Sequence, residues 1–244
     1  MKRLLGVALA ALLTLGGTSF AQEKMKVRIG VEGAYPPFSS VDPSGQVVGF
    51  DIDIANALCA EMKAECTQVP QEWDGMIPAL QARKFDAIVA QMSITEERQK
   101  SVLFTNKYSN SPAWLVAKAG TGPDQSAAAW KGKRIGVQRT TTHDRYATQH
   151  FTASEVVRYA KQDELFLDLA AGRVDAVLCD SVAADMGFIK TPTGKGFARV
   201  GEPIDDPKIF GIGAGIAVRK GDTALAEKLN TAIKAIRANG TYKK

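Results

Sequence analysis

Histidine, cysteine and long apolar runs are all scarce in this chain of 244 residues. The two histidines, His143 and His150, are seven positions apart and have no cysteine or carboxylate at ligand spacing, so no metal site is predicted. Beyond the first twenty residues no stretch is apolar enough to span a bilayer, and no dense run of Lys and Arg indicates a polyanion-binding surface. These absences argue against a metalloprotein, an integral membrane protein and a nucleic-acid-binding protein.

The N-terminus has the pattern of a secretory signal peptide. Lys2 and Arg3 precede an apolar run, 4–15, and the small-residue end Ser19-Phe20-Ala21. The apolar run is too short for a comfortable membrane span. We expect export and cleavage near Ala21. Losing Lys2 and Arg3 would lower the net charge from +5 to +3, a mild excess that does not indicate a nucleic-acid partner.

Two sequence elements occur twice, which predicts two similar α/β lobes. The first is Arg28-Ile29-Gly30-Val31, which recurs as Arg134-Ile135-Gly136-Val137. The second is the run 83–89, which is echoed by 172–178 and follows a helix-like segment in both cases. Open α/β sheets bind ligands beyond the carboxyl ends of their strands, so a binding site is expected where the two lobes face each other.

Two apolar runs, 114–118 and 209–218, are interpreted as the strands that cross between the lobes. After a signal peptide at 1–21, the first lobe would then comprise 22–112 and 214–244, and the second lobe 113–213 including the crossings. The glycines of 209–218 resemble a phosphate loop only superficially, because no Lys-Ser/Thr ending and no suitable helix follow them. No nucleotide or other cofactor is expected.

The segment that begins at Gln91 predicts half of a binding site. A buried strand ends at Ala90, and Ser93 or Thr95 can start a helix that carries Arg98 one turn on. Free N–H groups at a helix start and a guanidinium both suit a carboxylate or phosphate, although a capped surface helix would have the same pattern. Asp180 ends the corresponding strand of the second lobe. A cation and an anion facing each other across a cleft would suit a zwitterion.

Loops beyond other strands carry further candidates. Glu32 and Tyr35 follow the first strand in a loop stiffened by two prolines, which places them toward the cleft. Trp73 precedes a predicted helix and either staples the entry of that helix or forms a cleft wall. Three hydroxyls at a helix start of the second lobe suit an anion or a carbonyl, or serve as solvated caps. These are Thr140, Thr141 and Thr142.

Two structural predictions concern the segment after residue 50. Asp51 is expected to cap a helix whose apolar stripe includes Ile52 and Ala55. Cys59 and Cys66 are seven positions apart, at the end of that helix and the start of the next strand, and are expected to pair in an exported protein. The third cysteine, Cys179, ends an apolar strand and is expected to be a buried, inert thiol.

The ordered set of motifs over residues 25–244 resembles a known family, the periplasmic polar amino acid binding proteins of ABC importers (bacterial solute-binding protein family 3), and most of all its histidine and lysine/arginine/ornithine binding branch. The resemblance implies a two-lobed α/β periplasmic binding protein of type 2, with a two-strand hinge and a ligand cleft between the lobes. Relatives usually continue beyond the last motif, so Lys244 resembles a truncated end. The motifs are Gly49 to Asp53, Trp73 to Leu80, Ser93-Ile94-Thr95 with Arg98, Phe104-Thr105, and Gly240-Thr241-Tyr242.

The resemblance also implies roles for individual residues. Arg98 would bind the ligand α-carboxylate, helped by Ser93 and by Thr140 with its backbone N–H, and Asp180 would take the α-ammonium. Contacts to the ligand side chain fall on Glu32, Tyr35 and Trp73, with Thr141 or Thr142 nearby. Two departures bear on ligand choice. Ala90 and Gln91 stand where relatives usually have two serines, and Arg139 replaces a small residue.

The function expected from the residues and the resemblance is capture of an L-amino acid and its delivery to a membrane ABC permease, by a monomer and without catalysis. Glu32 would pair with a cationic side chain between Tyr35 and Trp73, which favours arginine, lysine, ornithine or histidine. Gln91 adds an amide, so glutamine or an opine remains an alternative. Another alternative is a lyase on the same fold, similar to cyclohexadienyl dehydratase, with Glu32 as its general acid.

Overall fold

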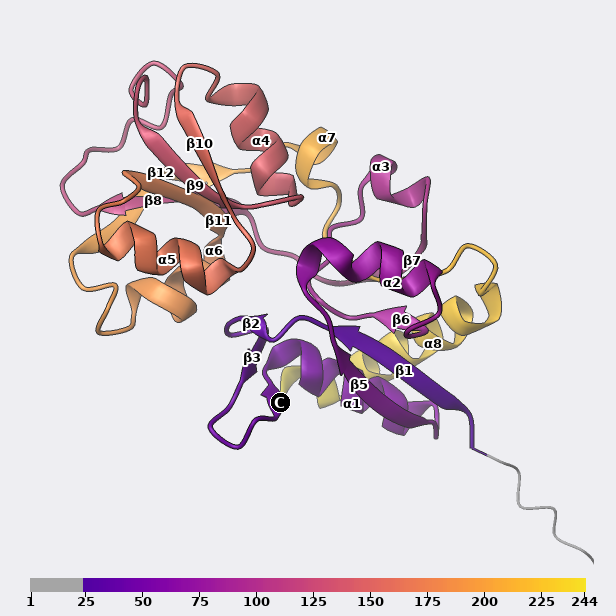
Figure 1. Ribbon diagram of the computed structural model, residues 1–244. Helices are drawn as coiled ribbons and strands as arrows, with labels where there is room; N and C mark the ends of the chain where they lie inside the picture. Colours follow the sequence, from indigo (N-terminus) through magenta and orange to yellow (C-terminus); the bar gives the residue numbers. More distant parts are fainter. Residues whose placement is uncertain (1–23) are drawn as a thin grey trace, which may run out of the picture.

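Two five-stranded sheets organise the protein into two lobes (Figure 1). The computed structural model describes residues 24–244, so the expected signal peptide, 1–21, lies outside the described residues. We call the sheet that contains the first strand, with its helices, the first lobe, and the other sheet with its helices the second lobe. No helix within 24–244 combines the length and the apolar character needed to cross a bilayer.

The first sheet has the order β5-β1-β6-β13-β7, in which β1 runs parallel to β5 and β6, and β13 runs antiparallel to its neighbours β6 and β7. Its strands are β1 (Lys26–Val31), β5 (Glu65–Pro70), β6 (Ala87–Ile88), β7 (Leu103–Ser109) and β13 (Ala214–Val218). A smaller antiparallel sheet beside it contains β2 (Ala34–Tyr35), β3 (Ser39–Val41) and β4 (Val47–Val48). The helical elements of this lobe are α1 (Phe50–Glu61), η1 (Trp73–Gly75), α2 (Met76–Gln81), α3 (Glu96–Gln99), α8 (Thr223–Ala238) and η3 (Thr241–Lys243).

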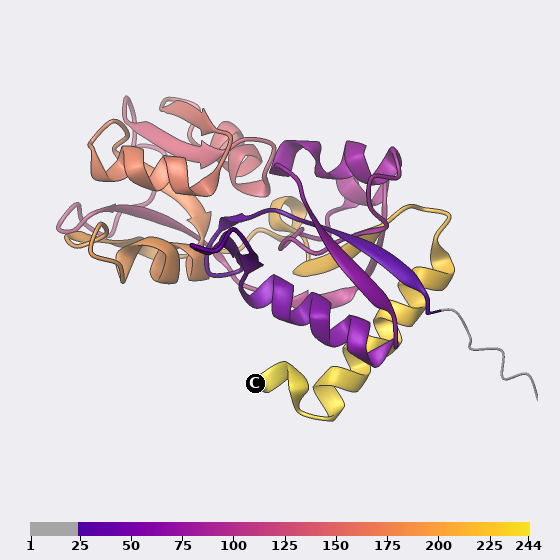
Figure 2. The same ribbon diagram turned by 60° about the horizontal axis from the view of Figure 1, so that its bottom comes forward.

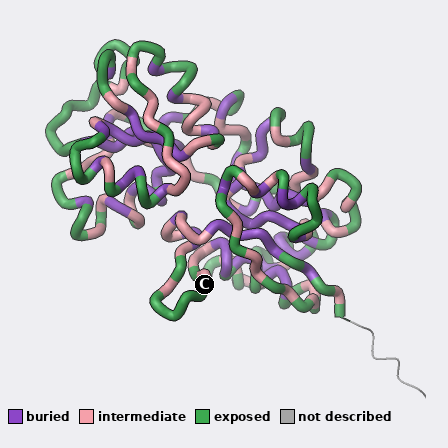
Figure 3. The backbone as a smooth tube through the Cα atoms, viewed as in Figure 1, coloured by how far each residue is buried: buried purple, intermediate pink, exposed green. Residues whose placement is uncertain are grey.

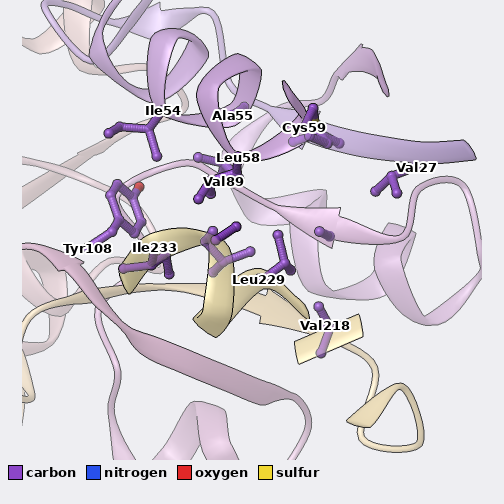
Figure 4. Packing of buried hydrophobic residues seen from close by; sticks show 14 of the residues in the cluster. Val27, Ile54, Ala55, Leu58, Cys59, Val89, Tyr108, Val218, Leu229 and Ile233 are labelled. Atoms are coloured by element: carbon purple, nitrogen blue, oxygen red, sulfur yellow. The ribbon is translucent and has the colours of Figure 1, made fainter. Parts of the chain in front are cut away.

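Alternate side chains of the first sheet enter two separate cores, because successive residues of a strand point to opposite faces. On one face, residues such as Ile29 and Val89 pack against α1 and α8. Figure 2 shows these two helices on the same side of the sheet, and Figure 4 shows Val89, Leu58 and Leu229 in this core. On the other face, Ile88 and its neighbours pack against α2. Buried segments accordingly concentrate in the strands at the centre of each lobe (Figure 3).

The second sheet has the order β10-β9-β11-β8-β12. Its strands are β8 (Ala113–Lys118), β9 (Arg134–Gln138), β10 (Glu155–Tyr159), β11 (Ala176–Asp180) and β12 (Phe197–Ile204). One face packs against α4 through Ala147, and the other against α5 through Leu165. The helical elements are α4 (Thr142–His150), α5 (Gln162–Ala170), α6 (Ser181–Ala184), η2 (Asp185–Ile189) and α7 (Pro207–Phe210).

The internal repeat has the same physical basis in both lobes. Arg28 at the start of β1 donates from its backbone N, Nε and Nη2 to Asp86, at distances of 2.9–3.1 Å. Arg134 at the start of β9 makes the matching three contacts with Asp175, at 2.8–3.4 Å. In each lobe the pair joins the first strand to the parallel strand beside it that comes third in the repeat, β6 after α2 in the first lobe and β11 after α5 in the second. The repeated sequence therefore encodes a repeated strand–helix–strand–helix–strand unit.

The chain crosses between the lobes twice, at 110–112 and at 205–213. The prediction that 114–118 forms the first crossing is wrong, because this run is a strand, β8, paired on both edges within the second sheet. The second crossing contains α7 and ends where Ile94 exchanges backbone hydrogen bonds with Ile212 (3.3 Å) and Gly213 (2.8 Å). The apolar residues of 114–118 and 214–218 are therefore core strands, whereas 209–213 belong to the second crossing.

Two local predictions have different outcomes. The disulfide between Cys59 and Cys66 is confirmed, and Cys179 is a buried free thiol. The prediction that Asp51 caps α1 is wrong, because the first N–H groups of the helix, on Phe50 and Asp51, donate to the carbonyl oxygens of Pro37 (3.1 Å) and Phe38 (2.8 Å). The Asp51 carboxylate is fully buried instead.

Candidate functional site

Two adjoining cavities lie between the lobes. The narrow cavity has a volume of about 30 Å³ and is lined from the first lobe by the carboxylate of Glu32 and the guanidinium of Arg98. The wide cavity has a volume of about 430 Å³ and is lined by Asp180 of the second lobe. The residues shared by both linings are Tyr35, Gln91, Ser93, Thr142 and His143. The two cavities therefore form one continuous site that carries charges of both signs.

Arg98 is a half-buried cation without an acidic partner. It lies in the short helix α3, which Thr95 caps by accepting a hydrogen bond from the Arg98 backbone N–H at 3.2 Å. Its Nη1 donates to the carbonyl oxygen of Ser93 at 3.2 Å. Within residues 24–244 no carboxylate comes within ion-pair distance of its guanidinium. Desolvation lowers the Arg98 pKa to about 10, so this position favours a bound anion.

Glu32 follows β1, is buried and lines the narrow cavity. Its Oε1 accepts a hydrogen bond of 2.6 Å from Nε2 of Gln138, which ends β9 in the second lobe. Burial raises the pKa of Glu32 to about 7, although the Gln138 hydrogen bond acts in the opposite direction. Tyr35, one wall of the cavity, is buried and stacks on Phe38 with 5.5 Å between the ring centroids.

Asp180 is held rigidly at the carboxyl end of β11. Its Oδ1 accepts from the backbone N–H groups of Val182 (2.8 Å) and Ala183 (3.0 Å) and so caps α6. Its Oδ2 accepts from the hydroxyl of Ser111, which lies in the first crossing. Burial raises the pKa of Asp180 above its usual value. A cationic group in the wide cavity would find this carboxylate already oriented.

Gln91 is fixed by a buried network. Its backbone has φ +47, and its N–H donates to the hydroxyl of Tyr108 at 3.0 Å. The side-chain Nε2 donates to Asp51 at 2.7 Å, and Oε1 accepts from Ser109 at 2.5 Å. Tyr108 also donates to Asp51 at 2.8 Å. Most of the hydrogen-bonding capacity of this amide is therefore used within the protein.

The hydroxyl residues of the second lobe divide between the site and the surface. Thr141 lines the narrow cavity, donates to the Gln138 carbonyl at 2.7 Å and caps α4 through the Asp144 N–H at 3.1 Å. Thr142 is buried and lines both cavities. Thr140 lines neither cavity: it is exposed, and its N–H donates to the Asp144 carboxylate at 3.1 Å. The predicted ligand contact by the Thr140 N–H is therefore not supported.

The other predicted residues are brought together. The narrow cavity is lined by Glu32, Tyr35, Trp73, Ala90, Gln91, Ser93, Arg98, Thr141 and Thr142, and the wide cavity adds Asp180. Sequence reasoning missed Gln138 and His143, which also line the narrow cavity. The signal for Gln138 was the repeat, because it follows Arg134 to Val137 as Glu32 follows Arg28 to Val31. His143 is kept neutral, since burial and the charge of Arg98 lower its pKa to about 4.

Within residues 24–244, three polar contacts between side chains of the two lobes lie around this site. Besides the Glu32–Gln138 hydrogen bond, two ion pairs lie at the rim of the cleft. Asp74 pairs with Arg139 at 2.5 Å, and Glu97 pairs with Arg145 at 2.8 Å. We call these two ion pairs the rim pairs. Among the residues described, no group of three or more His, Cys, Asp or Glu side chains could hold a metal ion.

Known proteins resemble the chain over its whole length. An L-arginine-binding protein of Pseudomonas aeruginosa is 55% identical and is matched over 94% of its length by all of this chain. The lysine/arginine/ornithine-binding periplasmic protein of Escherichia coli is 41% identical, with the same coverage. A solved periplasmic binding protein of Salmonella typhimurium, described as highly specific for arginine, superposes with a TM-score of 0.83 at 35% identity, over 90% of this chain and 96% of that one. The family described as bacterial extracellular solute-binding proteins, family 3, matches residues 27–244, and this chain belongs to it.

Proposed function

We propose that this protein captures a cationic L-amino acid in the periplasm and delivers it to the permease of an ABC importer. The observation that carries the proposal is the Arg98 guanidinium, which faces a cavity between the lobes without an anionic partner among the described residues. A buried or half-buried charge is costly unless it is paired, so a ligand carboxylate at this position would be strongly favoured. The relatives named above for arginine or lysine binding support the same ligand class.

The two cavities suit the three charges of such a ligand. The α-carboxylate would lie at Arg98 and Ser93, near the N-terminal turn of α4 at Thr142. The α-ammonium would lie in the wide cavity at Asp180, whose carboxylate is oriented by α6. The cationic side chain would reach Glu32 between Tyr35 and Trp73. Each ligand charge would then find a protein charge of the opposite sign.

The two crossings support a mechanism of hinge closure. The cation at Arg98 belongs to the first lobe, and the anion at Asp180 belongs to the second. Only when the lobes approach each other would both groups contact the same ligand. The hydrogen bond from Ser111 to Asp180 joins the first crossing directly to the site, so movement of the crossing would reposition the group that holds the ammonium.

A thermal-shift panel of amino acids tests the proposal. A ligand present at a hundred times its dissociation constant adds about 2.7 kcal/mol to the free energy of unfolding, which raises the melting temperature. We expect arginine, lysine, ornithine or histidine to raise it most, and neutral and acidic amino acids to raise it less. A response confined to neutral amino acids would contradict the role given to Glu32.

The raised pKa of Glu32 is the one observation that favours the lyase alternative, which can be tested directly. The Glu32 pKa of about 7 is the kind of value that a general acid requires. Prephenate or arogenate turnover by the purified protein would favour the enzyme. Binding of cationic amino acids with no turnover of either compound would favour transport, as the names of the relatives do.

A further inference from the structure

The amide of Gln138 lies where a ligand of the proposed function would place its cationic end. Gln138 is buried at the end of β9, and its Nε2 donates to Glu32 Oε1 at 2.6 Å. It is the one hydrogen-bond partner of the Glu32 side chain within residues 24–244. Its second N–H donates to the carbonyl oxygen of Ala160 at 3.2 Å, which holds the amide in the second lobe. In this structure, Gln138 therefore satisfies the carboxylate that the ligand would need.

The size of the narrow cavity agrees with this arrangement. Its volume of about 30 Å³ has room for a few water molecules, whereas pockets for small ligands usually measure about 300–1,000 Å³. Glu32, Gln138 and Arg98 all line this same small space. A long cationic side chain cannot reach Glu32 here while the Gln138 amide keeps its position.

We propose that Gln138 is a specificity-determining residue that acts as an internal competitor: its amide occupies Glu32 in the empty protein, and a ligand side chain must displace it. This inference rests on the proposed function. A guanidinium or ammonium would add the attraction between opposite charges to its hydrogen bond with the Glu32 carboxylate, which the neutral amide lacks, so it could replace the amide with a net gain. A ligand with a neutral amide would replace the Gln138 hydrogen bond to Glu32 with a similar one, so it would gain little binding free energy.

The contact follows from the two-fold repetition of the chain. Glu32 and Gln138 stand at the same position after the repeated Arg-Ile-Gly-Val element, one in each lobe. Because the carboxyl ends of β1 and β9 face each other across the cleft, the two equivalent positions meet. The pair is thus a built-in contact between the lobes, formed by residues that a ligand must separate.

Substitutions at Gln138 with opposite expected effects test the inference. Gln138→Leu removes the donor at similar size, so calorimetry should show roughly tenfold tighter arginine binding. Gln138→Lys places a stronger competitor against Glu32 and should weaken arginine binding at least tenfold. A purely structural role would weaken binding in both variants. Circular dichroism melting curves verify that each variant is folded.

Two controls distinguish competition by Gln138 for Glu32 from a general weakening of the contacts between the lobes. Glu97→Gln removes an inter-lobe contact at the rim without touching either cavity, and it should not reproduce the gain of Gln138→Leu. In a Glu32→Gln background, Gln138→Leu should no longer tighten arginine binding, because the competitor has lost its charged target. Equal or weaker binding by Gln138→Leu in the natural background would overturn the inference alone. Failure of the unmodified protein to bind any cationic amino acid would overturn the proposed function as well.

Discussion

The guanidinium carbon of Arg98 lies 5.1 Å from the centroid of the Trp73 ring. The aromatic face attracts the cation without accepting any of its N–H groups in a strong hydrogen bond. The only hydrogen bond from the guanidinium within residues 24–244 is the one from Nη1 to the Ser93 carbonyl. Most of the guanidinium N–H groups therefore remain available to a ligand. Trp73 therefore orients Arg98 for bidentate binding of a carboxylate.

Substitution of Arg98 should abolish most of the affinity. Arg98→Ala would leave the ligand carboxylate desolvated and unpaired, so binding should weaken by about 2–5 kcal/mol in calorimetry. Lys84→Ala is a suitable control, because Lys84 is exposed in the same lobe and lines neither cavity. If the Arg98→Ala and Lys84→Ala variants bound the ligand with equal affinity, Arg98 would not be part of the binding site.

Arginine affinity should increase with pH until Glu32 is fully ionised. Burial, with smaller contributions from the charges of Asp51, Asp163 and Asp74, raises the pKa of free Glu32 to about 7. A cationic ligand favours the ionised form and lowers this pKa, so binding below pH 7 must release a proton. We expect affinity to fall by up to about tenfold per pH unit between pH 7 and 5.5.

The Glu32→Gln variant should remove this part of the pH dependence. His143, with a pKa of about 4, stays neutral over the same range and contributes no proton. Calorimetry in two buffers of different ionisation enthalpy measures the released proton directly. A pH profile that is unchanged in Glu32→Gln would show that another group titrates.

The ionisation of Asp51 should make folding less favourable at high pH. This carboxylate is fully buried, its Oδ2 has no hydrogen-bond partner, and burial raises its pKa to about 7. The folded state therefore binds a proton that the unfolded chain releases near pH 4, and stability from this group decreases as pH rises from about 4 to 7. We therefore compare the free energy of unfolding of Asp51→Asn with that of the unmodified protein. The difference should favour the variant more at pH 8 than at pH 5. Urea unfolding at both pH values measures this difference. The same difference at pH 8 and pH 5 would contradict the prediction.

Removal of the disulfide should destabilise the first lobe without altering the site. Cys59 and Cys66 close a short loop, so the chain-entropy relation predicts a loss of about 2 kcal/mol in the Cys59→Ala, Cys66→Ala double variant. Urea unfolding gives the loss, and calorimetry should show unchanged ligand affinity. Reduction of the unmodified protein is the matched control and should give a similar loss.

Gly211 should tolerate no side chain. Its φ is +75, and a Cβ there would clash with the carbonyl oxygen of Ile94, next to the hydrogen bonds that end the second crossing. Gly211→Ala should lower both the free energy of unfolding and ligand affinity, because the crossing must shift. Gly221→Ala, in open space and without a positive φ, should change neither. Similar behaviour of the two variants would contradict a rigid role for Gly211.

The parts predicted well from sequence were those in which a local pattern has one physical solution. The repeat predicted two α/β lobes, because the same arginine–aspartate pair and strand sequence recur. The repeat and the segment after Ala90 placed Arg98 and Asp180 beyond the strand ends, and both line the cavities between the lobes, while their contacts with a ligand stay predictions. These assignments needed only the order of elements along the chain.

The parts predicted badly depend on what the folded chain places next to a residue. Asp51 has the sequence signal of a cap, but carbonyl groups of Pro37 and Phe38 already occupy the helix start. Thr140 and Thr141 are neighbours, and only the position of the Asp144 carboxylate and N–H decides which one faces the cleft. Gln138 was missed because its partner is 106 positions away in sequence.

The rim pairs share one polarity: both acids, Asp74 and Glu97, belong to the first lobe, and both arginines, Arg139 and Arg145, belong to the second. The lobes therefore attract each other whatever lies between them. Salt screens the attraction between partly exposed charges. Ionic strength will therefore change the fraction of ligand-free protein that is in the closed conformation. The contribution of the rim pairs to affinity will be the same for every amino acid, which separates this electrostatic bias from the selection made by Glu32 and Gln138.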